Sequence, residues 1–117
     1  MCSSDLAYPM TTGPNRRAVN VITVYIDPGL EGIVPGFLEN RKRDVQTLET
    51  ASQQNNMAQI RMIGHRMKGD GGGYGFDAIS TMGAALEQAA AREDRDAIRR
   101  HIAEFIDFLA RVTVVYR

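Results

Sequence analysis

The chain has 117 residues, of which 44% are hydrophobic and 24% are charged, and this is the composition of one ordinary globular domain rather than of a disordered or fibrous protein. Fourteen basic and fourteen acidic side chains give a net charge of zero, so the chain has no overall field to attract nucleic acid or an anionic membrane. Its apolar runs are far shorter than the roughly 20 residues of a membrane helix, and no secretory signal pattern opens the chain, so we expect a soluble cytoplasmic protein.

The two ends of the chain differ in composition from its middle. Residues 1–18 mix Ser, Thr, Gly and Pro without a period, which predicts a flexible N-terminal tail. Residues 19–26, VNVITVYI, are β-branched and aromatic and predict a strand, and residues 112–117, VTVVYR, have the same character. Because one strand cannot satisfy its own backbone, we expect the ends of the folded domain, 19–117, to pair as a small ribbon; extension of the last helix through 112–117 is the alternative.

The middle of the chain predicts helices. Residues 27–34, DPGLEGIV, can form a short extra helix, and Pro35 suits the first turn of the next one. Three further helices are expected to start at about Asn55, near Phe76 and near Glu93. Each of the four long helices has a set of apolar residues for the core, and in the last three helices these residues recur with three- and four-residue spacing: Phe37, Leu38, Val45 and Leu48; Ile60, Ile63 and Met67; Ile79, Met82 and Leu86; Ile98, Ile102, Phe105, Leu109 and Val112. Short connections between four such helices favour an all-α antiparallel four-helix bundle, which buries the stripes together.

Two stretches stand out from these stripes. The basic run RKR, residues 41–43, predicts a solvated face of its helix, and the glycines between 71 and 75 are expected to end the following helix. The sequence GDGGGYG also raises the possibility of a nucleotide-binding enzyme. It follows a helix rather than a strand, however, and it lacks the GxxxxGK[ST] order of a phosphate-binding loop.

One helix carries a histidine outside its apolar stripe. At about 100° per residue, Met67 lies about 20° from Ile60 on the helix, whereas His65 lies about 140° away and points from the core. No metal site is predicted, because ligands come in sets: His101 belongs to another helix, where we expect a packed boundary residue, and the single cysteine, Cys2, lies in the tail.

The residues around this histidine suggest a chemistry. An exposed imidazole is a nucleophile that needs no catalytic base, so His65 can accept a group. Lys68 and Arg61, within one turn on the same side, would offset the negative charge of a phosphoryl group. Gly64 borders the buried stripe, which favours close helix packing, and Gly69 borders the histidine, where a missing side chain keeps the imidazole open to a bulky partner.

The series His65, Lys68, Gly69 and Gly75, followed by an amphipathic helix that ends in LEQAA, resembles the signature of histidine-containing phosphotransfer (HPt) domains of bacterial phosphorelays. The stretch PGFLENRKRDVQTL is similar to the preceding helix of that family, and the resemblance covers roughly residues 27–110. It implies that His65 is the phosphorylated residue, that Lys68 assists, and that Gly69 and Gly75 shape the site.

Asp70 departs from the family pattern, since many relatives carry a small residue such as serine at this position. A carboxylate there would either weaken phosphoryl acceptance or only cap the next turn.

The resemblance also implies partners and a reaction. The expected partners are receiver domains of response regulators and hybrid histidine kinases, which supply Mg²⁺ and exchange a phosphoryl group between their aspartates and His65. The carrier itself needs no cofactor and no nucleotide-dependent kinase activity, and we expect a monomer. Arg61 and Arg66, with Lys68, make the region locally basic, which suits an acidic receiver pocket, although a solvated helix face explains these charges equally well. The alternative function is a helical protein-interaction module whose histidine is incidental.

Overall fold

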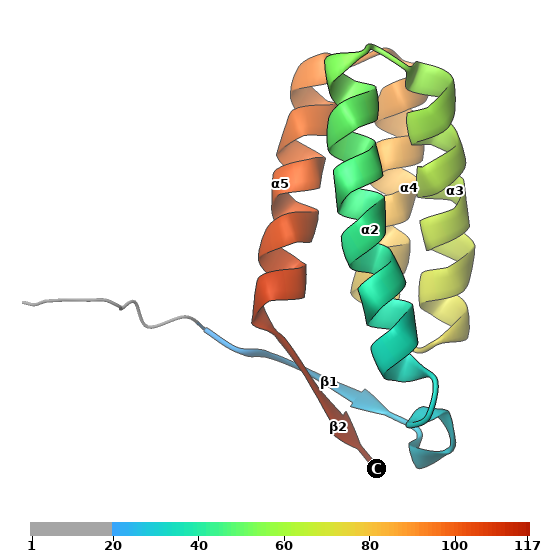
Figure 1. The fold of residues 1–117 in the computed structure, drawn as a ribbon, viewed down its shortest axis with the longest axis vertical. Coiled ribbons are helices and arrows are strands. Elements are labelled where there is room, and N and C mark those ends of the chain that lie inside the picture. The colour runs from blue at the N-terminus through green and yellow to red at the C-terminus, as the bar shows by residue number, and fades with distance from the viewer. Residues whose placement is uncertain (1–19) are drawn as a thin grey trace, which may run out of the picture.

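The computed structural model describes residues 20–117, and within them four long helices form an up-down bundle (Figure 1). They are α2 (Val34–Gln53), α3 (Met57–Gly73), α4 (Asp77–Ala91) and α5 (Arg95–Arg111). Consecutive helices are joined by connections of three residues, 54–56, 74–76 and 92–94, and such short connections make neighbours antiparallel. The predicted four-helix bundle is therefore confirmed. The predicted tail, 1–18, lies outside the described residues.

Polar side chains fix where two of the helices begin. The side-chain oxygen of Asn56 accepts a hydrogen bond from the backbone N–H of Gln59 at 3.2 Å, and the carboxylate of Asp94 accepts one from the N–H of Ala97 at 3.1 Å. Each of these N-caps satisfies a donor that the first helical turn leaves free and contributes about 1 kcal/mol. Helices α3 and α5 consequently begin directly after these two residues.

The four apolar stripes meet in one core. Each helix contributes a completely buried side chain: Leu48, Ile60, Leu86 and Phe105. Other predicted stripe residues are only partly buried and pack against this core from its rim: Leu38, Val45, Met82 and Leu109. In the part of the chain that the structure describes, no helix combines the length and the apolar character needed to cross a membrane.

The backbones of helices α3 and α4 are in close contact where two glycines face each other. A Cβ atom on Gly64 would lie 2.7 Å from the carbonyl oxygen of Gly83, and one on Gly83 would lie 2.6 Å from the carbonyl oxygen of Gly64. Gly71 makes a similar approach, since its Cβ would lie 2.6 Å from the backbone nitrogen of Ser80. No side chain fits into these contacts, which confirms the close packing predicted at Gly64.

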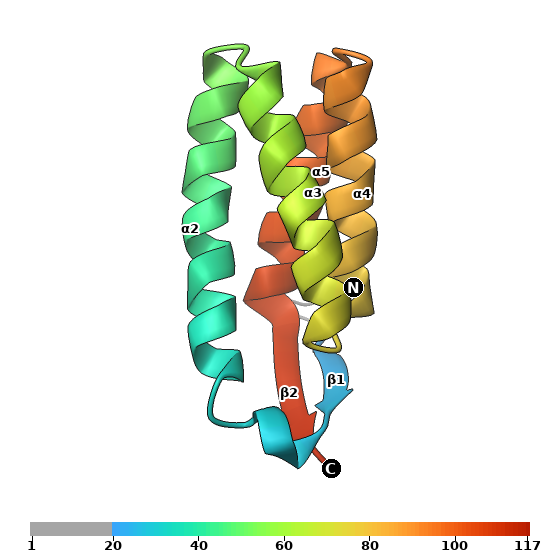
Figure 2. The same cartoon turned by 90° about the vertical axis from the view of Figure 1, so that its right-hand side faces the viewer.

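The two ends of the domain pair as a small sheet (Figures 1 and 2). Strands β1 (Ile22–Ile26) and β2 (Val112–Tyr116) run parallel, with Ile22 opposite Val112. The predicted ribbon is therefore present, and the alternative of a longer last helix is wrong. Alternate residues of both strands pack against the core: Ile22, Val24 and Ile26; Val112, Val114 and Tyr116. The fold is mostly helical but not purely so.

Two local expectations need correction, and a third is confirmed. The extra helix expected over 27–34 is absent, and a single 3-10 turn, Pro28–Leu30, is found there instead. The carboxylate of Asp27 caps this turn by accepting a hydrogen bond from the backbone N–H of Gly29 at 2.8 Å. Proline and glycine are poor helix formers, which explains why no longer helix forms. Helix α3 runs to Gly73 and so ends within the glycine stretch, 71–75, that was predicted to end it. Val112 does not extend the stripe of α5, since the helix ends at Arg111.

Candidate functional site

His65 lies midway along α3 and faces solvent. Its side chain is 70% exposed, whereas Ile63 and Met67 on either side of it are buried in the core. The helical phase therefore predicted its direction correctly. An exposed imidazole in the middle of a rigid helix has a fixed backbone and an open approach for a reacting partner.

A carboxylate from the neighbouring helix holds this imidazole. Glu87 on α4 has one oxygen 3.0 Å from Nδ1 of His65 and the other 3.1 Å from Nζ of Lys68. Glu87 thus joins the histidine and the lysine, which stand three residues apart on α3. The site contains two of the predicted residues and one that the sequence analysis missed.

The glycine contact between the helices explains why Glu87 reaches His65. A Cβ atom on Gly64 would lie 2.8 Å from the backbone nitrogen of Glu87, so the α4 backbone passes directly over Gly64. The position of Glu87, four residues after Gly83 on the same face of α4, is the sequence signal that could have identified it. Using that signal requires the pairing of Gly64 with Gly83, which periodicity within one helix does not reveal.

Glu87 is ionised at neutral pH. The hydrogen bond from Lys68 lowers the pKa of Glu87 most, and the hydrogen bond from His65 lowers it further, whereas partial desolvation opposes both. The carboxylate is only partly exposed, yet its two partners outweigh the desolvation.

The charge of Glu87 determines which imidazole nitrogen is free. An ionised carboxylate can only accept hydrogen bonds, so Nδ1 of His65 must be the donor at 3.0 Å. In the neutral imidazole the lone pair then lies on Nε2. The arrangement therefore presents an oriented nitrogen nucleophile to solvent, with Lys68 beside it to offset incoming negative charge.

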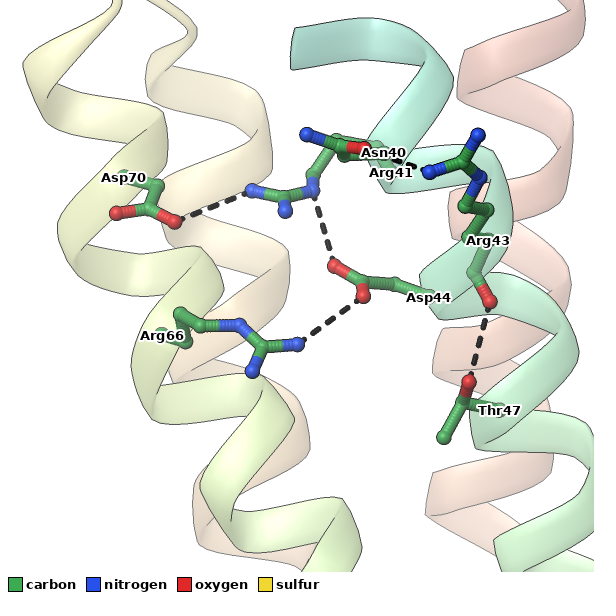
Figure 3. Close-up of polar contacts among 7 residues, drawn as sticks. All are labelled: Asn40, Arg41, Arg43, Asp44, Thr47, Arg66 and Asp70. Atoms are coloured by element: carbon green, nitrogen blue, oxygen red, sulfur yellow. Dashed lines mark hydrogen bonds and ion pairs between the residues drawn. The ribbon is translucent and has the colours of Figure 1, made fainter.

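The two predicted arginines lie in different surroundings. Arg61 is exposed and lines a shallow hollow together with Met62, His65 and Glu87. Arg66 turns the other way, toward α2, where one of its terminal nitrogens donates to a carboxylate oxygen of Asp44 at 3.1 Å (Figure 3). The structure thus places one basic side chain on the α4 side of the histidine and a second on the α2 side.

The basic run 41–43 is solvated only in part. Lys42 and Arg43 are exposed, and Arg43 donates to Asn40 of its own helix at 3.4 Å. Arg41 is buried, with a side chain only 7% exposed, so the expectation of a fully solvated face is wrong for this residue. The buried positions of α2 are spaced three and four apart and include 41 and 44: Val34, Phe37, Arg41, Asp44, Leu48 and Ala51. This spacing is the signal that the analysis of charge alone overlooked.

The two predicted glycines differ in their relation to the histidine. Gly69 is helical, and a Cβ atom there would meet nothing within 4 Å, so packing does not require a glycine. Gly75 lies in the turn after α3 with a φ of +87°, a conformation that favours glycine. Ten residues separate it from His65, of the order of 15 Å along a helix, so the structure does not bring Gly75 to the imidazole.

No metal centre emerges from the described residues. Among residues 20–117, no group of three or more His, Cys, Asp or Glu side chains is placed to hold a metal ion. His101 is a boundary residue of α5, as predicted: its side chain is 19% exposed and its Nδ1 lies 3.0 Å from a carboxylate oxygen of Glu104.

Comparison with protein-family models matches residues 33–113 to the Hpt domain. The match covers more than half of the chain and spans all four long helices, including both helices of the site. Comparison with curated proteins gives no match, and neither does comparison with solved structures.

Proposed function

Because the chain belongs to the histidine-containing phosphotransfer (Hpt) domain family, we propose that His65 is its phosphoryl-accepting residue. Domains of this family are histidine phosphotransfer carriers in phosphorelays rather than kinases. The observation that carries the assignment to this residue is the exposed imidazole whose Nδ1 is occupied by Glu87 and whose Nε2 is open.

The chemistry at His65 requires no proton transfer in the attacking step. The Nε2 lone pair attacks the phosphorus of a receiver's phospho-aspartate, an N–P bond forms, and the O–P bond breaks to regenerate the aspartate carboxylate. The proton on Nδ1 stays in place, so the phosphorylated ring is positively charged. The ionised Glu87 lies 3.0 Å from that ring and stabilises the positive charge as it develops.

Lys68 stabilises the other charge of the reaction. Its ammonium group is 3.1 Å from Glu87 and its side chain is 46% exposed, so it can turn toward a phosphoryl group on the neighbouring imidazole without leaving the helix surface. It forms no covalent bond in this scheme, and its contribution is electrostatic.

The proposed carrier exchanges its phosphoryl group with receiver domains of response regulators and hybrid histidine kinases. It acts as a soluble cytoplasmic monomer, uses no nucleotide of its own, and needs neither nucleic acid nor a membrane. The receiver approaches over the α3 surface, where Gly69 leaves room beside the histidine and where Arg61 and Arg66 offer positive charge on its two sides. Gly75 affects the site only through the turn that it forms.

Phosphoryl transfer can be measured directly. The purified chain is incubated with receiver domains phosphorylated by acetyl phosphate, and we expect an acid-labile, base-stable label that disappears in His65→Gln. His101→Gln is the matched control, because this second histidine also pairs with a glutamate, and it should be labelled like the wild type. A chain that binds receivers but is never labelled would instead be a helical interaction module.

A further inference from the structure

A chain of alternating charges runs between α2 and α3 beside the proposed site (Figure 3). It consists of Asp70, Arg41, Asp44 and Arg66, and we call it the Asp44 network. Arg41 lies 3.3 Å from Asp70 and 2.9 Å from Asp44, and Asp44 lies 3.1 Å from Arg66. The two middle side chains are only 7% and 9% exposed, whereas Asp70 and Arg66 at the ends are 43% and 49% exposed.

Stability alone does not explain this network. Removing two charges from water is costly, and a buried ion pair is often no more stabilising than an apolar pair of the same size. The 2.9 Å contact between Arg41 Nε and Asp44 is an ion pair without hydrogen-bond alignment, so it lacks the geometry that best offsets the cost.

One of the two exposed ends of the network, Arg66, adjoins the histidine in the sequence of α3. Arg66 follows His65 directly on α3, and it points toward α2 whereas His65 points toward Glu87 on α4. One of the five guanidinium donors contacts Asp44. The side chain is half exposed, so other donors remain available to a partner that covers His65.

We propose that Asp44 is a positioning residue, which holds Arg66 beside His65 as a fixed cationic contact for an incoming receiver. The inference rests on the proposed function, because a receiver brings an anionic phospho-aspartate to His65. A guanidinium that is already held in place loses less side-chain freedom on binding than a mobile one. Arg41 neutralises the buried carboxylate of Asp44 on its other side and pairs in turn with Asp70.

Transfer kinetics from a phosphorylated receiver test this role. Asp44→Asn keeps the shape of the side chain and removes its charge, and Arg66→Gln removes the contact itself. Each variant should raise KM for the receiver about three- to tenfold, the effect of a lost charge contact of this kind, with kcat within about twofold. The matched control Asp96→Asn, which breaks the exposed pair with Arg99 on α5, should leave both constants unchanged.

The double variant separates positioning from support of the fold. If Asp44 acts through Arg66, Asp44→Asn adds nothing to KM once Arg66→Gln is present. Additive effects on KM, or a loss of kcat in Asp44→Asn with KM unchanged, would overturn the proposal. Arg66→Gln removes a half-exposed side chain, so it should stay folded even if Asp44→Asn does not.

A measurement on the chain alone keeps this inference distinct from the proposed function. In the wild type, the ¹⁵N relaxation of the Arg66 side-chain Nε–H should match that of the α3 backbone, and in Asp44→Asn it should report free motion. A mobile Arg66 in the wild type would overturn the positioning role whatever the kinetics. If Arg66 is rigid in the wild type but no receiver transfers a phosphoryl group to the chain, the result would contradict the proposed function instead.

Discussion

In the proposed reaction, one ring nitrogen of His65 is hydrogen-bonded and the other is free to attack phosphorus. Glu87 makes that hydrogen bond: its carboxylate accepts from Nδ1 of His65 and also from the ammonium group of Lys68. A single side chain on α4 thereby sets the imidazole tautomer, fixes the ring and prepares a negative charge for the phosphorylated state. In the proposed reaction, Glu87 is therefore the residue that orients His65.

Replacing that carboxylate tests its role. In Glu87→Gln the neutral amide can either donate or accept, so both tautomers of His65 become populated and the positive charge of the phosphorylated ring loses its partner. We expect phosphoryl transfer to slow about tenfold, the effect of losing an orienting carboxylate. Long-range ¹H–¹⁵N spectra report the tautomer and a quenched time course reports the rate; an unchanged Nδ1–H tautomer and rate would contradict this role.

Acid titration gives the same variant a second readout. Because the folded state lowers the pKa of Glu87, its bridge stabilises the fold above the ordinary glutamate pKa and is lost as the pH falls through the lowered value. The free energy of unfolding of the wild type should therefore exceed that of Glu87→Gln at neutral pH and converge with it in acid. A stability difference that persists unchanged from neutral pH into acid would contradict the bridge.

Gly69 tests access to the histidine. The position is helical without a positive φ, and its surroundings are open, so Gly69→Gln should raise stability by up to about 1 kcal/mol. A helical side chain leans over the preceding turn, so the glutamine should cover His65 and strongly impair phosphotransfer. In the control Gly73→Gln, the new side chain starts about 12 Å from His65 along the axis of α3, so it should leave transfer intact. Full activity of Gly69→Gln would contradict the access role.

At the scale of elements, the contact between α3 and α4 is what assembles the site. Gly64 and Gly83 let the two backbones touch, and Glu87 extends from that contact to His65. Neither helix contains the site alone. The same argument explains why the glycines, which weaken isolated helices, are compatible with a stable bundle.

Gly64→Ala tests this contact. The added Cβ would lie 2.7 Å from the Gly83 carbonyl oxygen and 2.8 Å from the Glu87 nitrogen, and backbone atoms cannot move aside as a flexible side chain does. Separating the helices should cost about 1–3 kcal/mol and slow transfer by displacing Glu87. Chemical denaturation measures the cost, with Gly69→Ala as the matched control that should gain stability; equal stability of Gly64→Ala and the wild type would contradict the close contact.

Properties of single elements could be predicted from the sequence. Apolar spacing identified the four long helices and the outward direction of His65, and β-branched runs identified both end segments as strands. Features that depend on how elements pack together could not be predicted in this way. The pairing of Glu87 with His65 depends on how α4 is aligned along α3, and the contact between Gly64 and Gly83 sets this alignment. The burial of Arg41 was missed because the basic run 41–43 was interpreted only by its charge. The spacing of Arg41 from Phe37 and Leu48 places it on the buried face of α2.

At the scale of the whole molecule, the sheet and the site occupy separate parts of the bundle. Strands β1 and β2 pair where α2 begins and α5 ends (Figure 1), and they bring the two ends of the domain together. His65 lies halfway along α3 on the surface shared with α4. The sheet therefore supports the bundle while the helical surface remains accessible to a large partner.

The location of the phosphoryl group tests the central claim most directly. The ¹⁵N-labelled chain is treated with phosphoramidate, a small donor that phosphorylates accessible histidines, and long-range ¹H–¹⁵N and ³¹P spectra identify the modified nitrogen. We predict a single N–P bond on Nε2 of His65, with His101 unmodified and the group passing on to an added receiver domain. A phosphoryl group on Nδ1 of His65 or on His101, or an N–P bond that no receiver can discharge, would contradict the account.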